Sequence, residues 1–364
     1  AALTLNVQAE NVLVSQSSEG EQARDYSTFP SISDDGRFIA FISGADNLVP
    51  GDTNGKPDTF VHDRETRETT RVSVASDGNE ANDGVYWTIK SISGDGRYVV
   101  FSSGADNLVP GDSNETFDIF LHDRENRETS RISLADKGAE ADGNSWFPGI
   151  FGNGRYVTFE SSADNLVTGD TDGITDVFLH DRDTGLTRRV TLASDGSEAE
   201  KLQHWHSWMW WYTNPVSDDG RYAAFTSWSA NLVPGDDNAL QDVFVHDLET
   251  GQTERVSLDE KGRPFVNYSS LLLDMSDDGR YVAFQTLYRP DAPAGEWKPG
   301  GLYIRDRDAG RTTSIPGGFP AAFSSGGHDL AYMGPERPLR PELPAGIHVL
   351  DMQTYETLRS VVSY

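Results

Sequence analysis

A short string centred on Gly-Arg recurs along the whole of this 364-residue chain. Its glycine stands at residues 36, 96, 154, 220 and 279, with a degenerate copy at 327, so that the copies lie 60, 58, 66, 59 and 48 residues apart. A repeat longer than about 40 residues predicts a propeller or a solenoid. The six repeats, roughly 26–83, 84–142, 143–204, 205–265, 266–316 and 317–364, fill residues 1–364 as one domain.

Each repeat predicts four short strands. In the first copy they cover residues 29–32, 38–43, 59–62 and 70–74, and they are rich in β-branched and aromatic residues. A tight Asp-Gly turn joins the first two strands, since glycine supplies the positive φ that such a turn requires. Four antiparallel strands repeated radially form a propeller blade. We therefore expect an all-β fold, a six-bladed β-propeller of four-stranded antiparallel blades.

The segment at residues 11–15 resembles a fourth strand without its three predecessors. It is followed by Ser18-Glu19-Gly20, as the strand at 70–74 is followed by Ser76-Asp77-Gly78. We expect this N-terminal strand to pair with the sixth blade and close the ring. The last repeat has a fourth-strand candidate of its own near 357–362, and the sequence leaves open which of the two strands lies outermost.

The charge balance excludes several classes of partner. The chain has 58 acidic and 30 basic side chains, a formal charge of -28, and no cysteine. Such an acidic protein repels nucleic acid and anionic membranes, and no run approaches the roughly 18 apolar residues of a membrane span. Disulfides, thiolate metal sites and cysteine nucleophiles are excluded together. Because the chain starts with Ala1-Ala2 rather than Met, we expect a processed form, secreted or periplasmic.

The repeated strings resemble a known family. Ser-x-Asp-Gly-Arg-Tyr-x-x-Phe, followed in each repeat by Asp-x-Phe-x-His-Asp, is similar to the WD40-like repeats of TolB-type β-propellers over nearly the full length. The resemblance implies a propeller fold, and the family includes exported bacterial binding proteins, propeller halves of peptidases and some polysaccharide lyases. The chain departs from the peptidases, because no hydrolase domain fits and no Gly-x-Ser-x-Gly elbow is present.

The loop between the second and third strands carries a repeated set of oxygen ligands. Positions 1, 3 and 7 of this loop resemble the first half of a calcium loop. The residues are Asp52, Asn54, Asp58, Asp112, Asn114, Asp118, Asp170, Asp172, Asp176, Asp236, Asn238 and Asp242. Because clustered carboxylates repel one another, we expect up to four calcium sites of unequal affinity.

The calcium-loop resemblance is incomplete, since the closing Glu of an EF-hand is missing. Asp46, Asp106, Asp164 or water would have to complete the sites, and Ala230 stands at this place in the fourth copy. The alternative is a set of Asx-turns that only shape the loop.

A histidine, or in the fifth repeat an arginine, precedes aspartate at the end of the third strand, as His62, His122, His180, His246 and Arg305. A residue repeated in every blade is expected to support the fold rather than to act as a general base.

Residues 201–213 break the repeat and contain four of the eight tryptophans. In an up-and-down blade this connection emerges on the same face as the Asp/Asn loops, and aromatic residues occupy the corresponding connection in other repeats. Exposed aromatics suit stacking on sugar rings or apolar peptide side chains, whereas packing between blades is the alternative. The expected ligand-binding rim contains Tyr26, Tyr86, Trp87, Trp146, His204, Trp205, His206, Trp208, Trp210, Trp211 and Tyr268.

Three function classes remain open. The first is a binding module for a small molecule, neutral glycan or peptide at the channel mouth, and this is the reading we favour. The second is a glycan-cleaving enzyme, a lyase or glycoside hydrolase, with His204, His206 and Tyr212 as acid and base. A lyase acting on uronates needs cations near the rim, where the candidates are Arg24, Lys90, Lys201 and Arg263. The third is a protein-interaction scaffold.

Overall fold

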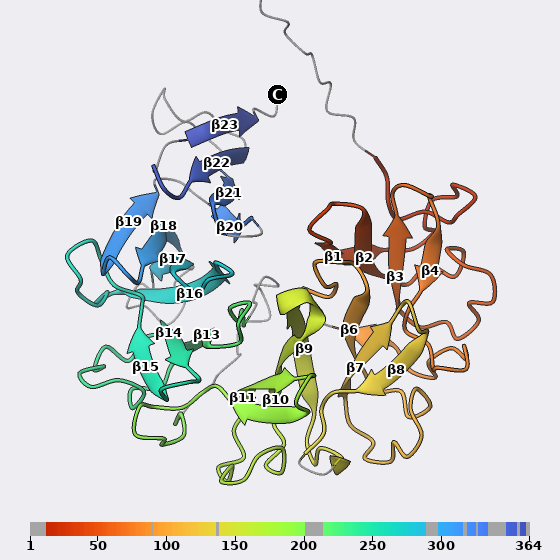
Figure 1. Ribbon diagram of the computed structural model, residues 1–364, viewed down its shortest axis with the longest axis horizontal. Helices are drawn as coiled ribbons and strands as arrows, with labels where there is room; N and C mark the ends of the chain where they lie inside the picture. The colour runs from red at the N-terminus through yellow and green to blue at the C-terminus, as the bar shows by residue number, and fades with distance from the viewer. Residues whose placement is uncertain are drawn as a thin grey trace, which may run out of the picture.

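The computed structural model describes residues 12–86, 88, 90–135, 138–200, 214–288, 298–315, 319–324, 327–333, 347–354 and 357–361. Within these residues, strands β1 to β23 form six antiparallel sheets that follow one another in chain order around a ring (Figure 1). Each sheet consists of strands that are consecutive in the sequence. The predicted six-bladed β-propeller is confirmed.

The first three blades each contain four strands. The first blade comprises β1 (Ser27–Ile32), β2 (Phe38–Ser43), β3 (Asp58–Asp63) and β4 (Thr69–Arg71). The second comprises β5 (Val85–Tyr86), β6 (Tyr98–Ser103), β7 (Asp118–Asp123) and β8 (Glu128–Arg131). The third comprises β9 (Ser145–Phe151), the 3-10 turn η2 (Gly152–Gly154), β10 (Tyr156–Ser161), β11 (Asp176–Asp181) and β12 (Leu186–Arg189).

The other three blades repeat this order. Among the described residues the fourth has three strands, β13 (Tyr222–Ser227), β14 (Asp242–Asp247) and β15 (Gln252–Arg255), with a single bridge between Val216 and Ala223 where other blades have a first strand. The fifth comprises β16 (Tyr268–Met275), β17 (Tyr281–Tyr288), β18 (Lys298–Asp306) and β19 (Arg311–Ile315). The sixth comprises β20 (Phe319–Phe323), β21 (Asp329–Met333), β22 (Ile347–Asp351) and β23 (Thr357–Val361).

The core lies within and between the blades. Inside each of the first four blades a phenylalanine on the second strand stacks on one on the third; Phe101 and Phe120, for example, are 5.8 Å apart and fully buried. Between blades, Ile92 and Val99 of the second pack against Ala40 of the first in one buried cluster. Each blade covers the apolar face of its neighbour, so that both faces of a strand are buried. The strand sequences are therefore apolar over several consecutive residues and do not alternate between apolar and polar residues.

The Gly-Arg string forms the turn between the first and second strands. In the fourth blade, the Ser217 hydroxyl donates to Asp219 (2.6 Å), and this carboxylate accepts the Arg221 backbone N–H (3.0 Å). Gly220 has φ +74°, and a Cβ on it would lie 2.2 Å from the Tyr156 ring of the third blade. The glycine is therefore required both for the turn and for the approach of the neighbouring blade.

The repeated His-Asp pairs support the fold, as expected from their recurrence. The His122 Nδ1 lies 2.9 Å from the Thr129 hydroxyl, and burial lowers the pKa of this imidazole to about 4. Asp123 accepts two parallel hydrogen bonds from Arg97, at 3.0 and 2.7 Å, and these hold its pKa at about 2. The same bidentate pair recurs in other blades, for example between Arg37 and Asp63.

The described part of the N-terminal segment, which begins at residue 12, contacts the first blade. Asn11 lies outside the described residues, and residues 12–15 are not in a strand. All four strands of the sixth sheet come from residues 319–361, with β23 at its outer edge. Instead, Gln16 bridges Gln22 in a short turn, and the Ser18 hydroxyl accepts the Thr69 backbone N–H at 3.0 Å. Among the described residues, the expected pairing of an N-terminal strand with the closing blade is therefore not found.

Candidate metal centre and aromatic face

The Asp/Asn loop of the first blade is closed by an arginine, Arg71. Arg71, at the end of β4, points its Nη1 at three carboxylates: Asp52 at 3.1 Å, Asp58 at 3.2 Å and Glu80 at 3.0 Å. The Arg71, Asp52 and Asp58 side chains are each at most 9% exposed. The Arg71 guanidinium therefore supplies positive charge at the place where we expected a metal ion.

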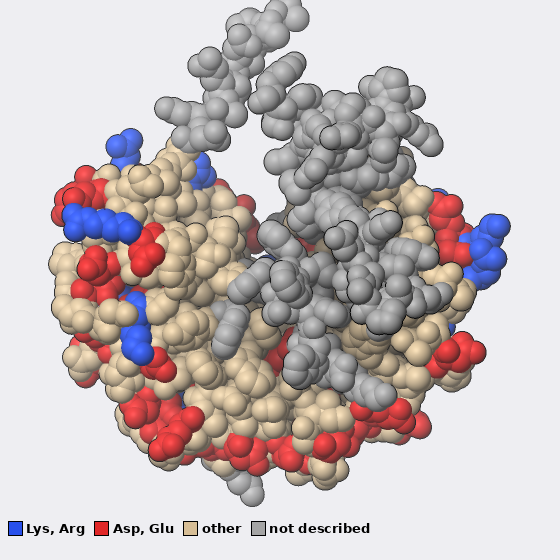
Figure 2. Space-filling model, turned by 180° about the vertical axis from the view of Figure 1, so that it is seen from behind, with Lys and Arg blue, Asp and Glu red and all other residues tan. Residues whose placement is uncertain are grey.

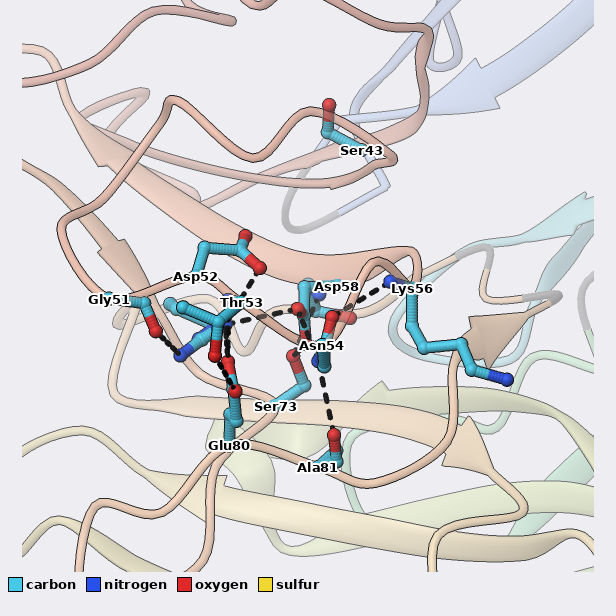
Figure 3. Close-up of polar contacts among 12 residues, drawn as sticks. Ser43, Gly51, Asp52, Thr53, Asn54, Lys56, Asp58, Ser73, Glu80 and Ala81 are labelled. Carbon is cyan, nitrogen blue, oxygen red and sulfur yellow. Dashed lines mark hydrogen bonds and ion pairs between the residues drawn. The ribbon is translucent and has the colours of Figure 1, made fainter.

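Asn54 of the same loop makes three hydrogen bonds through its side-chain amide. Its Nδ2 donates to Asp58 at 3.1 Å and to the Ala81 carbonyl at 3.0 Å, and its Oδ1 accepts the Lys56 backbone N–H at 2.8 Å (Figure 3). Ser73 donates to the other oxygen of Asp58. This is the Asx-turn arrangement that the sequence left as the alternative.

The second and fourth blades repeat the arginine-closed loop. Their guanidiniums are those of Arg131, which lies 2.8 Å from Asp112 and 3.1 Å from Asp118, and of Arg255, which lies 2.9 Å from Asp236 and 3.4 Å from Asp242. In these loops an arginine therefore offsets part of the carboxylate repulsion from which calcium was predicted, and calcium binding by these loops stays a prediction. The signal was present in the sequence, because an arginine follows the last aspartate of every loop by 13 residues.

The third blade is different because Asp172 replaces the asparagine. Asp170, Asp172 and Asp176 bring carboxylate oxygens within 4.8 Å of one another, and they are the one group among the described His, Cys, Asp and Glu residues that could hold a metal ion. Arg189 lies 3.2 Å from Asp170 and 3.3 Å from Asp176, so this loop also has its arginine.

The electrostatics of this cluster reflect crowded, buried carboxylates. Burial, together with the charges of Asp170 and Asp172, raises the pKa of Asp176 to about 7, although Thr191 and Arg189 act in the opposite direction. Burial also raises the pKa of Asp170 to about 6, again against the effect of Arg189. A cation bound here would favour the ionised forms of these groups.

The proposed completing residues are not in the group. Asp46, Asp106 and Asp164 raise the pKa of the first aspartate of their loops only as neighbouring charges. The Asp164 backbone N–H donates to Asp142 at 2.9 Å, and the Asp106 carboxylate accepts from Asn82.

The described aromatic residues of the predicted rim lie on the same face as these loops. Four of them stand at the start of the first strand of their blade: Tyr26, Tyr86, Trp146 and Tyr268. The start of this strand pairs with the end of the second strand, after which the Asp/Asn loops begin. Ser27, for example, pairs with Ser43. Trp87 and the predicted residues 204–212 lie outside the described residues.

The exposure of these rings differs. Tyr26 is 52% exposed, and its ring lies over Gly44, where a Cβ would be 3.0 Å from the ring. Tyr86 packs edge-on against Phe117 at 5.9 Å, and Tyr268 against Phe265 at 6.4 Å. Tyr26 is therefore an exposed ring, whereas Tyr86 and Tyr268 are half-buried.

The cations that a polyanionic substrate would need are already engaged. Arg24 pairs with Glu21 at 3.2 Å, Arg263 pairs with Asp259 at 2.7 Å, and the Lys90 ammonium lies 4.5 Å from the centre of the Phe151 ring. Lys201 lies outside the described residues. On the face shown in Figure 2, acidic side chains gather along the outer edge of the ring, with fewer basic ones.

Comparison with known proteins supports the fold. No protein-family model and no curated protein matches the chain. The β-propeller domain of the trilobed protease from Pyrococcus furiosus, described as having an open velcro topology, is 12% identical, with a TM-score of 0.53 over 94% of this chain and 85% of that one. An oligogalacturonate lyase in complex with manganese is 13% identical, with a TM-score of 0.50 over 93% and 77%.

A third match is a TolB-like protein from Agrobacterium tumefaciens, which is 16% identical with a TM-score of 0.44 over 80% of this chain and 81% of that one. The propeller fold that the resemblance implied is confirmed by the six sheets and by the match to the protease propeller domain. The part of the chain that the structure describes contains no helix with the length and hydropathy of a membrane span.

Proposed function

We propose that this protein is a non-catalytic binding module that holds a small neutral ligand, a glycan or a peptide, at the aromatic face of its ring. The observation that carries the proposal is the recurrence of an aromatic residue at the start of the first strand in four blades, with Tyr26 exposed among them. Flat rings on one face of a rigid scaffold suit stacking on sugars and apolar side chains.

The charge of the molecule favours a neutral ligand. The formal charge is -28, and Arg24 and Arg263, two of the cations expected near the rim, are paired with Glu21 and Asp259. An anionic glycan or an acidic peptide would therefore meet net repulsion.

Two additions complete the proposal. The acidic cluster of the third blade binds calcium, since hard oxygen donors suit this ion, and the protein is exported, as the TolB-type resemblance suggests. The matched lyase structure holds manganese, which makes cation identity a separate measurement.

A binding screen tests the proposal. We expect the full chain to bind at least one neutral glycan or peptide on an array, and calorimetry should confirm this binding. Tyr26→Ala should weaken the binding about tenfold, or by about 1.4 kcal/mol. The matched control is Leu186→Ala, because Leu186 is 48% exposed at the start of β12, on the opposite face. Equal binding by Tyr26→Ala and the parent would contradict the proposal.

The same screen separates the alternatives. Turnover of a glycan that is lost when His204 and His206 are replaced would identify an enzyme. Capture of a folded protein, with no glycan or peptide bound and loss on Trp205→Ala and Trp208→Ala, would identify an interaction scaffold.

A further inference from the structure

One substitution changes the hydrogen bonding of the third-blade loop. Asn54, Asn114 and Asn238 each donate from Nδ2 to the last aspartate of their loop (3.1, 3.0 and 2.7 Å) and to a backbone carbonyl 27 residues further on (3.0, 3.1 and 3.3 Å). Asp172 occupies the equivalent position, and the equivalent carbonyl is that of Ala199. A carboxylate has no N–H to donate. The Ala199 carbonyl and the Asp176 carboxylate therefore lack the amide donor present in the other blades, although Asp176 still accepts from Arg189 at 3.3 Å.

A second observation concerns Asp170. Its side chain is 1% exposed, and neither carboxylate oxygen accepts a hydrogen bond from the described residues. The nearest cation is Arg189, whose Nη1 lies 3.2 Å away but also 3.3 Å from Asp176 and 2.8 Å from Glu198. A buried carboxylate without a hydrogen bond is costly, and a positively charged ligand beside Asp170 would offset this cost.

The charge of the loop also sets it apart. Arg189 lies within 3.3 Å of Asp170, Asp176 and Glu198, and Asp172 adds a fourth carboxyl group, so that the carboxyl groups outnumber the guanidinium by three. In the first blade, Arg71 faces three carboxylates, so that the excess is two.

We infer that Asp170, Asp172 and Asp176 hold one hard divalent cation, with the Ala199 carbonyl and water completing its shell, and that the arginine-closed loops of the first, second and fourth blades hold none. The separation of the ligand oxygens fits, because two oxygens that each lie 2.3–2.6 Å from a calcium ion are at most about 5 Å apart. Mixed carboxylate and carbonyl ligands favour calcium over magnesium. This inference deepens the cation proposal above and does not depend on the aromatic-face ligand.

Calcium titration of the full chain tests the inference. After treatment with a chelator and dialysis, calorimetry with calcium chloride should give one site per chain. Asp172→Asn restores the amide found in the other blades, so it should fold normally and lose roughly 100-fold or more in affinity, because ligand charge sets calcium affinity. The reciprocal change Asn54→Asp gives the first-blade loop the same ligand pattern, and it should raise the stoichiometry to two.

The outcomes are decisive in both directions. No calcium binding by the parent, four sites, or unchanged affinity in Asp172→Asn would each overturn the inference, as would a stoichiometry of one in Asn54→Asp. Circular dichroism of metal-free Asp172→Asn should show an unfolding temperature equal to or above that of the metal-free parent. Tyr26→Ala should keep one calcium site, so failure of the aromatic-face proposal is seen separately.

Discussion

Replacing Arg131 with methionine should destabilise the protein strongly. Its Nη1 lies 2.8 Å from Asp112, 3.1 Å from Asp118 and 3.0 Å from Glu140, and its side chain is 6% exposed. Methionine approximates the aliphatic part of arginine but leaves these carboxylates without their cation. Removing one partner of a buried ion pair costs about 3–5 kcal/mol. For a cooperative transition of a chain of this length, that corresponds to a fall of roughly 4–7 °C in the unfolding temperature.

The assay is calorimetric unfolding at pH 7 and pH 5. Burial raises the pKa of Asp112 to about 6, so at pH 5 this carboxyl is already mostly protonated in the folded protein. The deficit of Arg131→Met should therefore be smaller at pH 5 than at pH 7. The control is Arg24→Met, because the Arg24 side chain is 67% exposed and pairs with the exposed Glu21; it should cost less than about 1 kcal/mol.

Two results would refute the reasoning. An unfolding temperature of Arg131→Met within about 1 °C of the parent would mean that the guanidinium does not stabilise the loop. A deficit that is the same at both pH values would mean that the loss comes from packing rather than from carboxylate repulsion.

Three further predictions concern the repeated turns and pairs. Gly220→Ala should cost at least about 2 kcal/mol in urea unfolding, because of the positive φ and the contact with Tyr156, whereas Gly20→Ala, which meets no atom within 4 Å, should cost only about 1 kcal/mol. Ion-paired Asp123 has its pKa lowered to about 2, so its stabilisation is present above about pH 4 and is lost as the pH falls toward 2; Asp123→Asn should flatten this part of the stability profile, and an unchanged profile would contradict the assignment. His122 should stay neutral down to about pH 4 in an NMR titration, and a midpoint near 6.5 would show that it is solvated.

The strand pattern of the fold was largely predictable from the sequence. The expected strand at 38–43 matches β2, and the expected 59–62 lies within β3. The expected fourth strand at 70–74 was too long, since β4 ends at Arg71 and Val74 already bridges Glu80 in the exit turn. Periodicity finds a strand, but whether a residue pairs with its own sheet or with the following turn depends on tertiary contacts.

The site was less predictable, because its charge balance depends on residues far apart in the chain. Spacing within one loop suggested calcium ligands, whereas the compensating Arg71 lies on another strand and Glu80 in another turn. The two arrangements share the same aspartates, so local sequence does not distinguish them. The difference between Asn54 and Asp172 was visible in the sequence, but its meaning depends on the carbonyl that only the fold brings near.

The turn that precedes a blade in the sequence makes hydrogen bonds with the fourth strand of that blade. Thr129 of the second blade donates to Ser76 and Val74 of the preceding turn, and Thr69 of the first blade makes the same contacts with Ser18 and Gln16. A segment that contains all of these contacts therefore does not coincide with one four-stranded sheet. It begins one turn earlier in the sequence than the first strand of that sheet. Grafting or duplicating a blade by cutting at its sheet boundaries would separate this threonine from its partners, whereas cutting ahead of the turn would carry them along.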